Sequence, residues 1–211
     1  MANQIWSWDI TYLPTTIKGQ YFYLYLIMDV FSRKIVGYEV YENESSEYAS
    51  MVAKEAYLSE KIEGKTVKLH SDNGSPMKGA TMLAMLQTLG VIPSFSRPSV
   101  SNDNPYSESL FKTLKYCPKY PSDPFKDLKS AREWVHAFVG WYNNEHRHRG
   151  IKFVTPSSRH QGLDQEILEN RKKVYEAAKA KNPSRWSKGT RNWSRIETVF
   201  LNPGKGVKKA S

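Results

Sequence analysis

The first 41 residues contain three strand-like segments in a row, and this run restricts the fold more than any other feature of the chain. Residues 6–12 alternate between two faces, with Trp6, Trp8 and Ile10 on one and Ser7, Asp9 and Thr11 on the other. Residues 21–30 and 34–41 are rich in aromatic and β-branched side chains, which predicts an antiparallel hairpin in the same sheet. We therefore expect a sheet that begins with three consecutive strands, and Asp9 pointing away from its aromatic surface.

Helices and strands are predicted to alternate after residue 44. Residues 45–60 have a helical period, with a serine at position 45 or 46 as the cap. The pattern then predicts a strand over residues 67–70, a helix over 77–89 that Gly90 ends, and a strand over 91–95. Asn104 and Pro105 are typical of the N-cap and the first residue of a further helix. This order indicates an α/β protein with a ribonuclease H-like fold, in which helices flank a mixed five-stranded sheet.

The second half of the chain is much more basic than the first. Residues 1–111 hold 9 Lys and Arg against 12 Asp and Glu, whereas residues 112–211 hold 22 against 9. Apolar periodicity predicts a helix over residues 127–142 and a very basic one over 163–180. We therefore expect two parts, a core over residues 1–160 and a basic helical extension over residues 161–211.

The formal charge of +10 favours a polyanionic partner, because phosphate contacts release counterions from nucleic acid. A solvated basic surface is the alternative. Residues 185–195 interleave cations with Trp186 and Trp193, which could stack on bases or could anchor a small terminal module. The longest apolar run, residues 21–28, is far shorter than the roughly 20 residues of a membrane span, and no secretory signal is recognisable. No membrane partner and a cytoplasmic location are expected.

Three carboxylates lie in different predicted elements. Asp9 is in the middle of a strand, Asp72 follows a strand in Ser-Asp-Asn-Gly, and Glu108 lies in the first turns of a helix. Mg²⁺ prefers hard oxygen ligands, and two such ions can assist displacement at phosphorus. Taken singly, the acids could be an exposed strand residue, an Asx turn and a first-turn helix acid. Taken together, they predict a Mg²⁺ or Mn²⁺ site, with Asp9 best placed to touch both ions.

The sequence around these acids resembles the catalytic part of insertion-sequence-3 family transposases, which are related to retroviral integrases. The matching segments are Trp8-Asp9-Ile10-Thr11-Tyr12, residues 29–37, His70-Ser71-Asp72-Asn73-Gly74, Ser96-Arg97-Pro98 before the Glu108 helix, residues 142–148 with Thr155-Pro156, and residues 185–193. This resemblance covers nearly the whole chain. It implies an integrase-like (DDE) core with Asp9, Asp72 and Glu108 as catalytic residues and metal ligands, and two ions per site when DNA is bound. The implied activity is DNA cleavage and strand transfer at transposon ends.

Several cations are expected to contact DNA. Lys112 and Lys115 follow Glu108 at i+4 and i+7, and they resemble the paired lysines of retroviral integrases, although a solvated helix face is the alternative. The other candidates are Arg97, Arg147, Arg149, Arg185 and Arg191. The run from His146 to His148 does not have a zinc spacing, so it is expected to contact phosphate or to be structural. The polar residues 96–103 are expected to form a mobile loop.

The resemblance also implies partners. Paired transposon ends and target DNA require more than one subunit, so at least a homodimer is expected, associated with the bacterial nucleoid. Full-length relatives usually carry an amino-terminal helix-turn-helix region, whereas Met1 lies eight residues before Asp9. We therefore expect a truncated form, the product of a shorter frame or a degenerate element, working with a separate helix-turn-helix protein or a full-length transposase.

Two alternatives stay open. One is a ribonuclease H-like nuclease that cuts without joining. Such enzymes that cut RNA–DNA hybrids generally use a fourth carboxylate, for which the sequence offers no clearly placed candidate. The other is a catalytically silent, DNA-binding inhibitor derived from a transposase.

Overall fold

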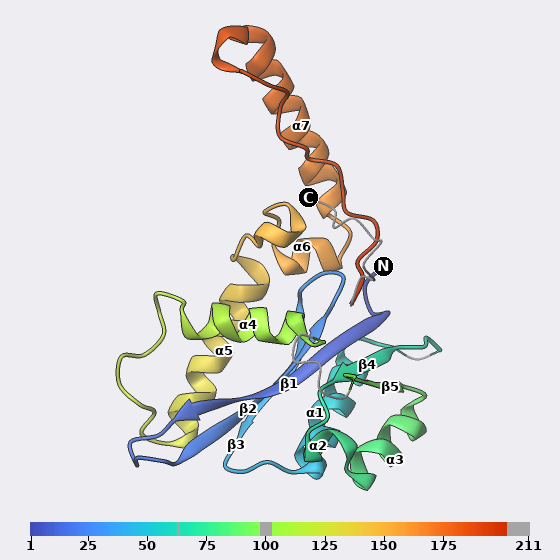
Figure 1. Ribbon diagram of the computed structural model, residues 1–211, viewed down its shortest axis with the longest axis vertical. Coiled ribbons are helices and arrows are strands. Elements are labelled where there is room, and N and C mark those ends of the chain that lie inside the picture. Colours follow the sequence, from blue (N-terminus) through green and yellow to red (C-terminus); the bar gives the residue numbers. More distant parts are fainter. Residues whose placement is uncertain (63, 98–102, 202–211) are drawn as a thin grey trace.

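A computed structural model describes residues 1–62, 64–97 and 103–201, and a five-stranded sheet forms the centre of this part of the chain (Figure 1). The strands are β1 (Ile5–Pro14), β2 (Tyr21–Asp29), β3 (Ile35–Tyr41), β4 (Lys68–Ser71) and β5 (Ile92–Phe95). Their spatial order is β3-β2-β1-β4-β5. β1 pairs antiparallel with β2 and parallel with β4, so the sheet is mixed, as predicted. Because β1 is the middle strand, Asp9 lies near the centre of the sheet.

Helices cover both faces of the sheet. One face carries α1 (Ser46–Ser59), α2 (Ser75–Lys78) and α3 (Ala80–Leu89), and the other carries α4 (Pro105–Lys115) and α5 (Leu128–Asn144). The predicted alternation of β1 is confirmed: Trp6 and Trp8 belong to the apolar cluster under α1 and α3. Leu13, on the other face, belongs to the cluster under α4 and α5. Asp9 shares the face of Leu13, and therefore the side of α4, because side chains alternate along a strand.

The prediction of a single helix over residues 77–89 is wrong, because the structure divides this region into α2 and α3. Gly79 separates them with φ −59° and ψ 141°, which is not helical. A Cβ atom at Gly79 would lie 2.4 Å from the Cβ of Ser46, at the start of α1. The chain passes α1 too closely here for any side chain. Periodicity within the segment could not reveal this contact.

The other predicted helices agree with the structure near their ends. Ser45 caps α1, since its side chain accepts a hydrogen bond from the Tyr48 N–H. Asp127 caps α5 in a capping box with Ser130. α4 begins at Pro105 as predicted. Of the predicted mobile loop, residues 98–102 lie outside the described residues.

A projecting arm follows the core. The chain continues through η1 (Arg149–Ile151), α6 (Pro156–His160), α7 (Asp164–Lys181) and η2 (Pro183–Arg185). α7 extends away from the sheet, and the segment after η2 returns beside it (Figure 1). We call residues 164–201 the arm. Within the described chain, no helix is both long enough and apolar enough to span a membrane.

A buried ion pair holds the base of the arm. Arg159 is fully buried, and its guanidinium donates to the Asp164 carboxylate (3.2 Å) and to the Ile196 carbonyl (2.7 Å). Arg195 forms a second, two-pronged contact with Asp164 at 2.9 and 3.0 Å. Both ends of the arm therefore meet at one carboxylate beside α6.

Candidate active site

The parallel pairing of β1 with β4 brings Asp9 and Asp72 to neighbouring positions. Ser7 pairs with His70, and each aspartate follows two residues later on its own strand. Paired strands lie about 4.8 Å apart. β4 ends at Ser71, so Asp72 stands where β1 continues beyond its neighbour. One acid is thus held in mid-strand and the other at a strand end.

Glu108 comes to the same region on α4. The Ser107 hydroxyl lies 2.7 Å from the hydroxyl of Ser7, and both residues are buried. This contact packs the first turn of α4 against β1, two residues from Asp9. Glu108 itself is exposed.

The charges of these acids affect one another. Burial raises the pKa of Asp9, a hydrogen bond from the Ile10 N–H (2.8 Å) opposes that rise, and the charges of Asp72 and Glu108 add to it, giving a pKa of about 7. Among the described residues, however, no three His, Cys, Asp or Glu side chains converge closely enough to hold a metal ion. The structure places the three predicted acids near enough for their charges to act on Asp9, but it does not close them into a cluster.

The donor set nevertheless fits a hard divalent cation. The three acids offer carboxylate oxygens, which suit Mg²⁺ or Mn²⁺. The Ser96 hydroxyl donates to Asp72 (2.7 Å), and the Asn73 side chain donates to the Ser96 carbonyl (2.8 Å). Burial is the main cause of the raised pKa of Asp9, and a cation held here would offset the repulsion from Asp72 and Glu108 that adds to it. A bound cation would thus stabilise the ionised form of these acids.

Glu44 is a further acid near the site that sequence reasoning missed. It is exposed in the connection between β3 and α1, and its charge also raises the pKa of Asp9. A hydrogen bond to Glu44 raises the pKa of Tyr12 as well. No local motif marks this glutamate. Only the order of the strands, which places β3 two strands from β1, reveals that it is close.

Two of the predicted DNA-contacting cations lie beside the acids, and a third is already paired. Lys112 and Lys115 are exposed on α4, one and two turns after Glu108. Arg97 forms a two-pronged ion pair with Asp103, at 2.8 and 2.9 Å. The guanidinium of Arg97 thus already has an anionic partner within the chain. Its contact with DNA stays a prediction.

The remaining cations lie far along the chain from the acids. Arg147 is exposed between α5 and η1, Arg149 is exposed at the start of η1, and Arg185 is exposed in η2. Arg191 is exposed but lies over the rings of Phe153 (5.1 Å) and Trp193 (5.5 Å). With Arg97, which follows β5, the expected DNA contacts are therefore distributed among the end of β5, α4, residues 147–149 and the arm.

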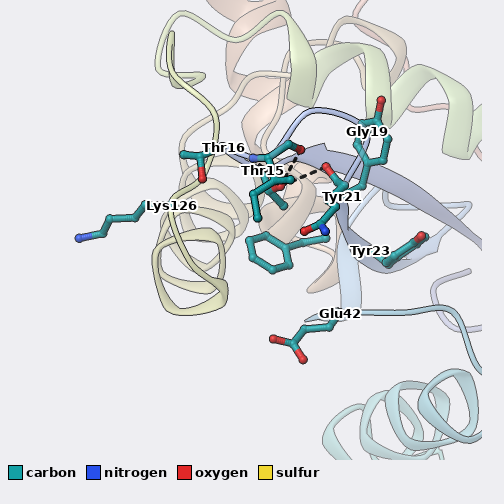
Figure 2. A pocket seen from close by; sticks show the side chains of 10 residues that line it. Thr15, Thr16, Gly19, Tyr21, Tyr23, Glu42 and Lys126 are labelled. Carbon is teal, nitrogen blue, oxygen red and sulfur yellow. Dashed lines mark hydrogen bonds between the residues drawn. The ribbon is translucent and has the colours of Figure 1, made fainter.

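A hollow of about 350 Å³ lies at the turn between β1 and β2 (Figure 2). Its lining includes Thr15, Tyr21, Tyr23, Glu42 and Lys126. In the described chain, Asp9, Asp72 and Glu108 are not among its lining residues. The hollow belongs to the hairpin end of the sheet and takes no part in the candidate site.

The fold is that of the integrase and transposase class. Two models of the integrase core domain match the chain, at residues 1–101 and 89–156. The chain belongs to the integrase core domain family. The resemblance to insertion-sequence-3 transposases is confirmed at the level of distant homology.

Curated relatives include transposases of bacterial insertion sequences. The transposase for insertion sequence element IS904 of Lactococcus lactis is 30% identical over 161 residues, which are 73% of this chain and 60% of the relative. The putative transposase for IS986/IS6110 of Mycobacterium tuberculosis is 23% identical over 158 residues, 73% of this chain and 56% of the relative. The chain thus spans little more than half the length of these relatives.

Solved structures share the fold. A chain of the simian T-cell lymphotropic virus intasome, in complex with a PP2A regulatory subunit, matches with a TM-score of 0.59 at 18% identity, over 76% of this chain and 55% of that one. The catalytic domain of the Mos1 mariner transposase matches with a TM-score of 0.54 at 13% identity, over 65% and 70%. The HTLV-2 integrase catalytic core, described in complex with magnesium, matches with a TM-score of 0.53 at 18% identity, over 76% and 97%. The predicted ribonuclease H-like fold is confirmed.

Proposed function

We propose that this chain is the catalytic part of a transposase, which cuts DNA at transposon ends and joins the released 3′-hydroxyl to target DNA. The observation that carries the proposal is the placement of three acids near one another: Asp9 in the middle of β1, Asp72 just after the end of β4, and Glu108 in α4. Burial raises the pKa of Asp9 to about 7, and the charges of Asp72 and Glu108 add to that rise. Membership of the integrase core domain family supports the same chemistry.

The three acids would hold two Mg²⁺ or Mn²⁺ ions when DNA is bound. Such ions supply activation of the attacking oxygen and stabilisation of the leaving oxygen in displacement at phosphorus. Asp9 is held rigidly in mid-sheet, and Asp72 and Glu108 complete the ligand set from either side. The magnesium complex described for the HTLV-2 integrase core supports this choice of metal.

Binding of DNA is assigned to the exposed cations. Lys112 and Lys115 would bind phosphates beside the reacting bond, while Arg147, Arg149, Arg185 and Arg191 would bind the backbone further away. Arg97 would join them at the edge of the site. The structural similarity to a chain of a viral intasome supports an assembly of at least two subunits on paired DNA ends.

The direct test is nicking and strand joining on a labelled duplex that carries the ends of the cognate element, with Mg²⁺ or Mn²⁺. Wild type should nick and join, and Asp72→Asn should do neither. Asp123→Asn is the matched control, because Asp123 is an exposed aspartate in the connection between α4 and α5. Equal activity of wild type and Asp72→Asn would contradict the proposal.

A nuclease that cuts without joining is the second candidate, and Glu44 favours it. The sequence alone offers no clearly placed fourth carboxylate. In the structure, Glu44 lies near enough for its charge to raise the pKa of Asp9. Cleavage of an RNA–DNA hybrid that Glu44→Gln abolishes, without joined DNA products, would establish this alternative. Binding of DNA with neither cleavage nor joining would instead indicate the silent inhibitor.

A further inference from the structure

Asn104 links the start of α4 to the strand that carries Asp9. It immediately precedes α4 and is fully buried. Its side-chain oxygen accepts a hydrogen bond from the Ser7 hydroxyl (2.5 Å), and its side-chain N–H donates to the Trp8 carbonyl (3.1 Å). These two residues directly precede Asp9. Since the Glu108 N–H donates to the Asn104 carbonyl (3.3 Å), one residue contacts the segments of two candidate ligands.

The use of this side chain is unusual for its position. Asparagine before a helix ordinarily accepts a hydrogen bond from the first turn, which stabilises the helix by about 1 kcal/mol. In the described structure the Asn104 side chain makes no such bond to α4. Its side chain makes its hydrogen bonds to β1 instead. The helix therefore has no side-chain cap from Asn104, but its first turn is held against the strand of Asp9.

His70 provides a similar link to the strand that leads to Asp72. It is buried on β4, two residues before Asp72. Its Nε2 atom lies 3.1 Å from the carbonyl of Asp103, and its Nδ1 atom lies 3.0 Å from the Ser94 hydroxyl. A carbonyl only accepts, so Nε2 carries the proton and Nδ1 accepts from Ser94. With both nitrogens engaged, the ring is a structural link and not a metal ligand.

We propose that Asn104 and His70 are positioning residues, which together fix the α4 acid Glu108 relative to Asp9 and Asp72. The inference rests on the proposed function, because it assigns these residues a task in holding the same metal ions. Asp103 and Asn104 are adjacent, so a single dipeptide contacts β4 through His70 and β1 through its own side chain. All three elements that carry an acid thereby meet at two buried residues.

Such a link affects metal binding more than overall stability. In the described structure the three acids lie near one another but not close enough to hold a cation, so their relative placement determines how readily they close on one. Loss of groups that orient metal ligands typically weakens affinity or activity by about 10- to 100-fold. A residue that serves only packing would lower stability without this effect.

The chain contains a matched control for Asn104. Asn143, in α5, is also a buried asparagine that joins a helix to a strand. Its side chain accepts from the Ile35 N–H (2.9 Å) and donates to the Ile35 carbonyl (3.0 Å). α5 and β3 carry none of the three acids. Asn143→Ala therefore removes an equivalent link away from the site.

The experiment compares the full chain with Asn104→Ser, Asn143→Ala, His70→Ala and His70→Gln. Serine at position 104 keeps a residue favoured at helix starts but cannot make both contacts. Glutamine at position 70 keeps an N–H donor for Asp103. Three quantities are measured: the midpoint of thermal unfolding, the affinity for Mn²⁺ by calorimetry, and amide hydrogen exchange in residues 105–108 without added metal.

We expect Asn104→Ser and His70→Ala to weaken Mn²⁺ binding by about tenfold or more and to speed exchange at the start of α4. His70→Gln should recover much of the affinity, and Asn143→Ala should lower the unfolding midpoint while leaving Mn²⁺ affinity unchanged. If Asn104→Ser binds Mn²⁺ as wild type does, or if Asn143→Ala weakens binding equally, the positioning role is overturned and the proposed function stands. If wild type and Asp9→Asn bind Mn²⁺ equally, the proposed function fails, and the positioning role fails with it.

Discussion

The sheet core and the arm differ in both packing and charge. The core has large apolar clusters on both faces of its sheet, and Asp9, Asp72 and Glu108 lie near one another within it. In α7, which is described throughout, Asp164 and Leu168 are the buried residues. The arm depends on a small cluster around Trp193 and carries nine Lys and Arg against five Asp and Glu. A rigid part suits chemistry that depends on placement, and an extended basic part suits binding of a backbone that presents charge everywhere.

The largest expected effect is the loss of activity in Asp9→Asn. Metal-assisted chemistry contributes several kcal/mol, so nicking should fall by about a thousandfold or more, while duplex binding by the arm is retained. Single-turnover nicking and a filter-binding assay measure the two. If DNA binding fell in parallel with nicking, the separation of the two regions would be wrong.

Asp9→Asn should also change stability in a pH-dependent way. Because the folded pKa of Asp9 is raised from 3.8 to about 7, its ionisation destabilises the fold above pH 4, and this penalty reaches its full size above pH 7. With a chelator present, the variant should therefore gain in unfolding temperature over wild type at pH 8, and gain little at pH 4. Thermal scans at both pH values measure the gain, and an equal gain at both would contradict the raised pKa.

Truncation of a buried leucine should affect the unfolding of the core and of the arm differently. Leu114 is a fully buried residue of α4 in the apolar cluster that α4 and α5 form with the sheet, so Leu114→Ala should cost about 2–5 kcal/mol of the free energy of unfolding. Leu168→Ala should release α7 while leaving the main unfolding transition of the core in place. Urea titration followed by circular dichroism measures both. An equal shift of the main transition would show that the arm is part of the same cooperative unit.

Neutralising the arm should weaken DNA binding without altering the chemical step. In the variant with Arg185→Gln and Lys188→Gln, each lost phosphate contact should reduce the slope of log affinity against log salt by about one. The single-turnover rate at saturating DNA should be unchanged. Lys172→Gln with Glu176→Gln is a control that leaves the net charge of the arm unaltered. An unchanged salt slope would remove these two cations from the DNA interface.

The smallest effect is expected at the junction between α6 and the core. Burial would lower the pKa of His160, but its bonds to Asp29 and Glu60 raise it overall. Burial opposes the drop at Glu60, yet its bonds to His160 and Lys34 bring that pKa to about 2. The stabilisation from His160 is therefore present below its unfolded pKa of about 6.5 and lost as pH rises through the raised value. That from Glu60 is present above its unfolded pKa of 4.5 and lost as pH falls towards 2.

Thermal unfolding across pH would reveal this junction. The unfolding temperature of wild type should fall at both the acidic and the alkaline end of the pH range. In His160→Gln the fall at the alkaline end should be absent. The ring lies 2.8 Å from the Glu60 carboxylate and 2.9 Å from the Ser32 hydroxyl, so the glutamine retains part of the packing. An alkaline decline of the same size in both proteins would assign it to another group.

The sequence predicted those features that depend on local pattern. Alternation in β1 placed Trp8 and Asp9 on opposite faces, and Pro105 marked the start of α4. Features that depend on distant neighbours were not predictable in this way. The break at Gly79 follows from the closeness of α1, and the proximity of Glu44 to Asp9 follows from the order of the strands.

Asn104 illustrates the limit most clearly. Its position at the helix start was predicted, but the sequence indicated a cap, whereas the folded chain directs its side chain to Ser7 and Trp8. Those partners are 97 and 96 residues away in the sequence. Local propensity identified the position, and only tertiary contact determined its use.

The most direct test of the whole account is the location of Mn²⁺ by anomalous diffraction from crystals of the chain soaked with that ion. The account predicts a peak within coordination distance of both Asp9 and Asp72, and its absence in crystals of Asp72→Asn. A peak away from these carboxylates, or an unchanged peak in the variant, would contradict the assignment of the active site.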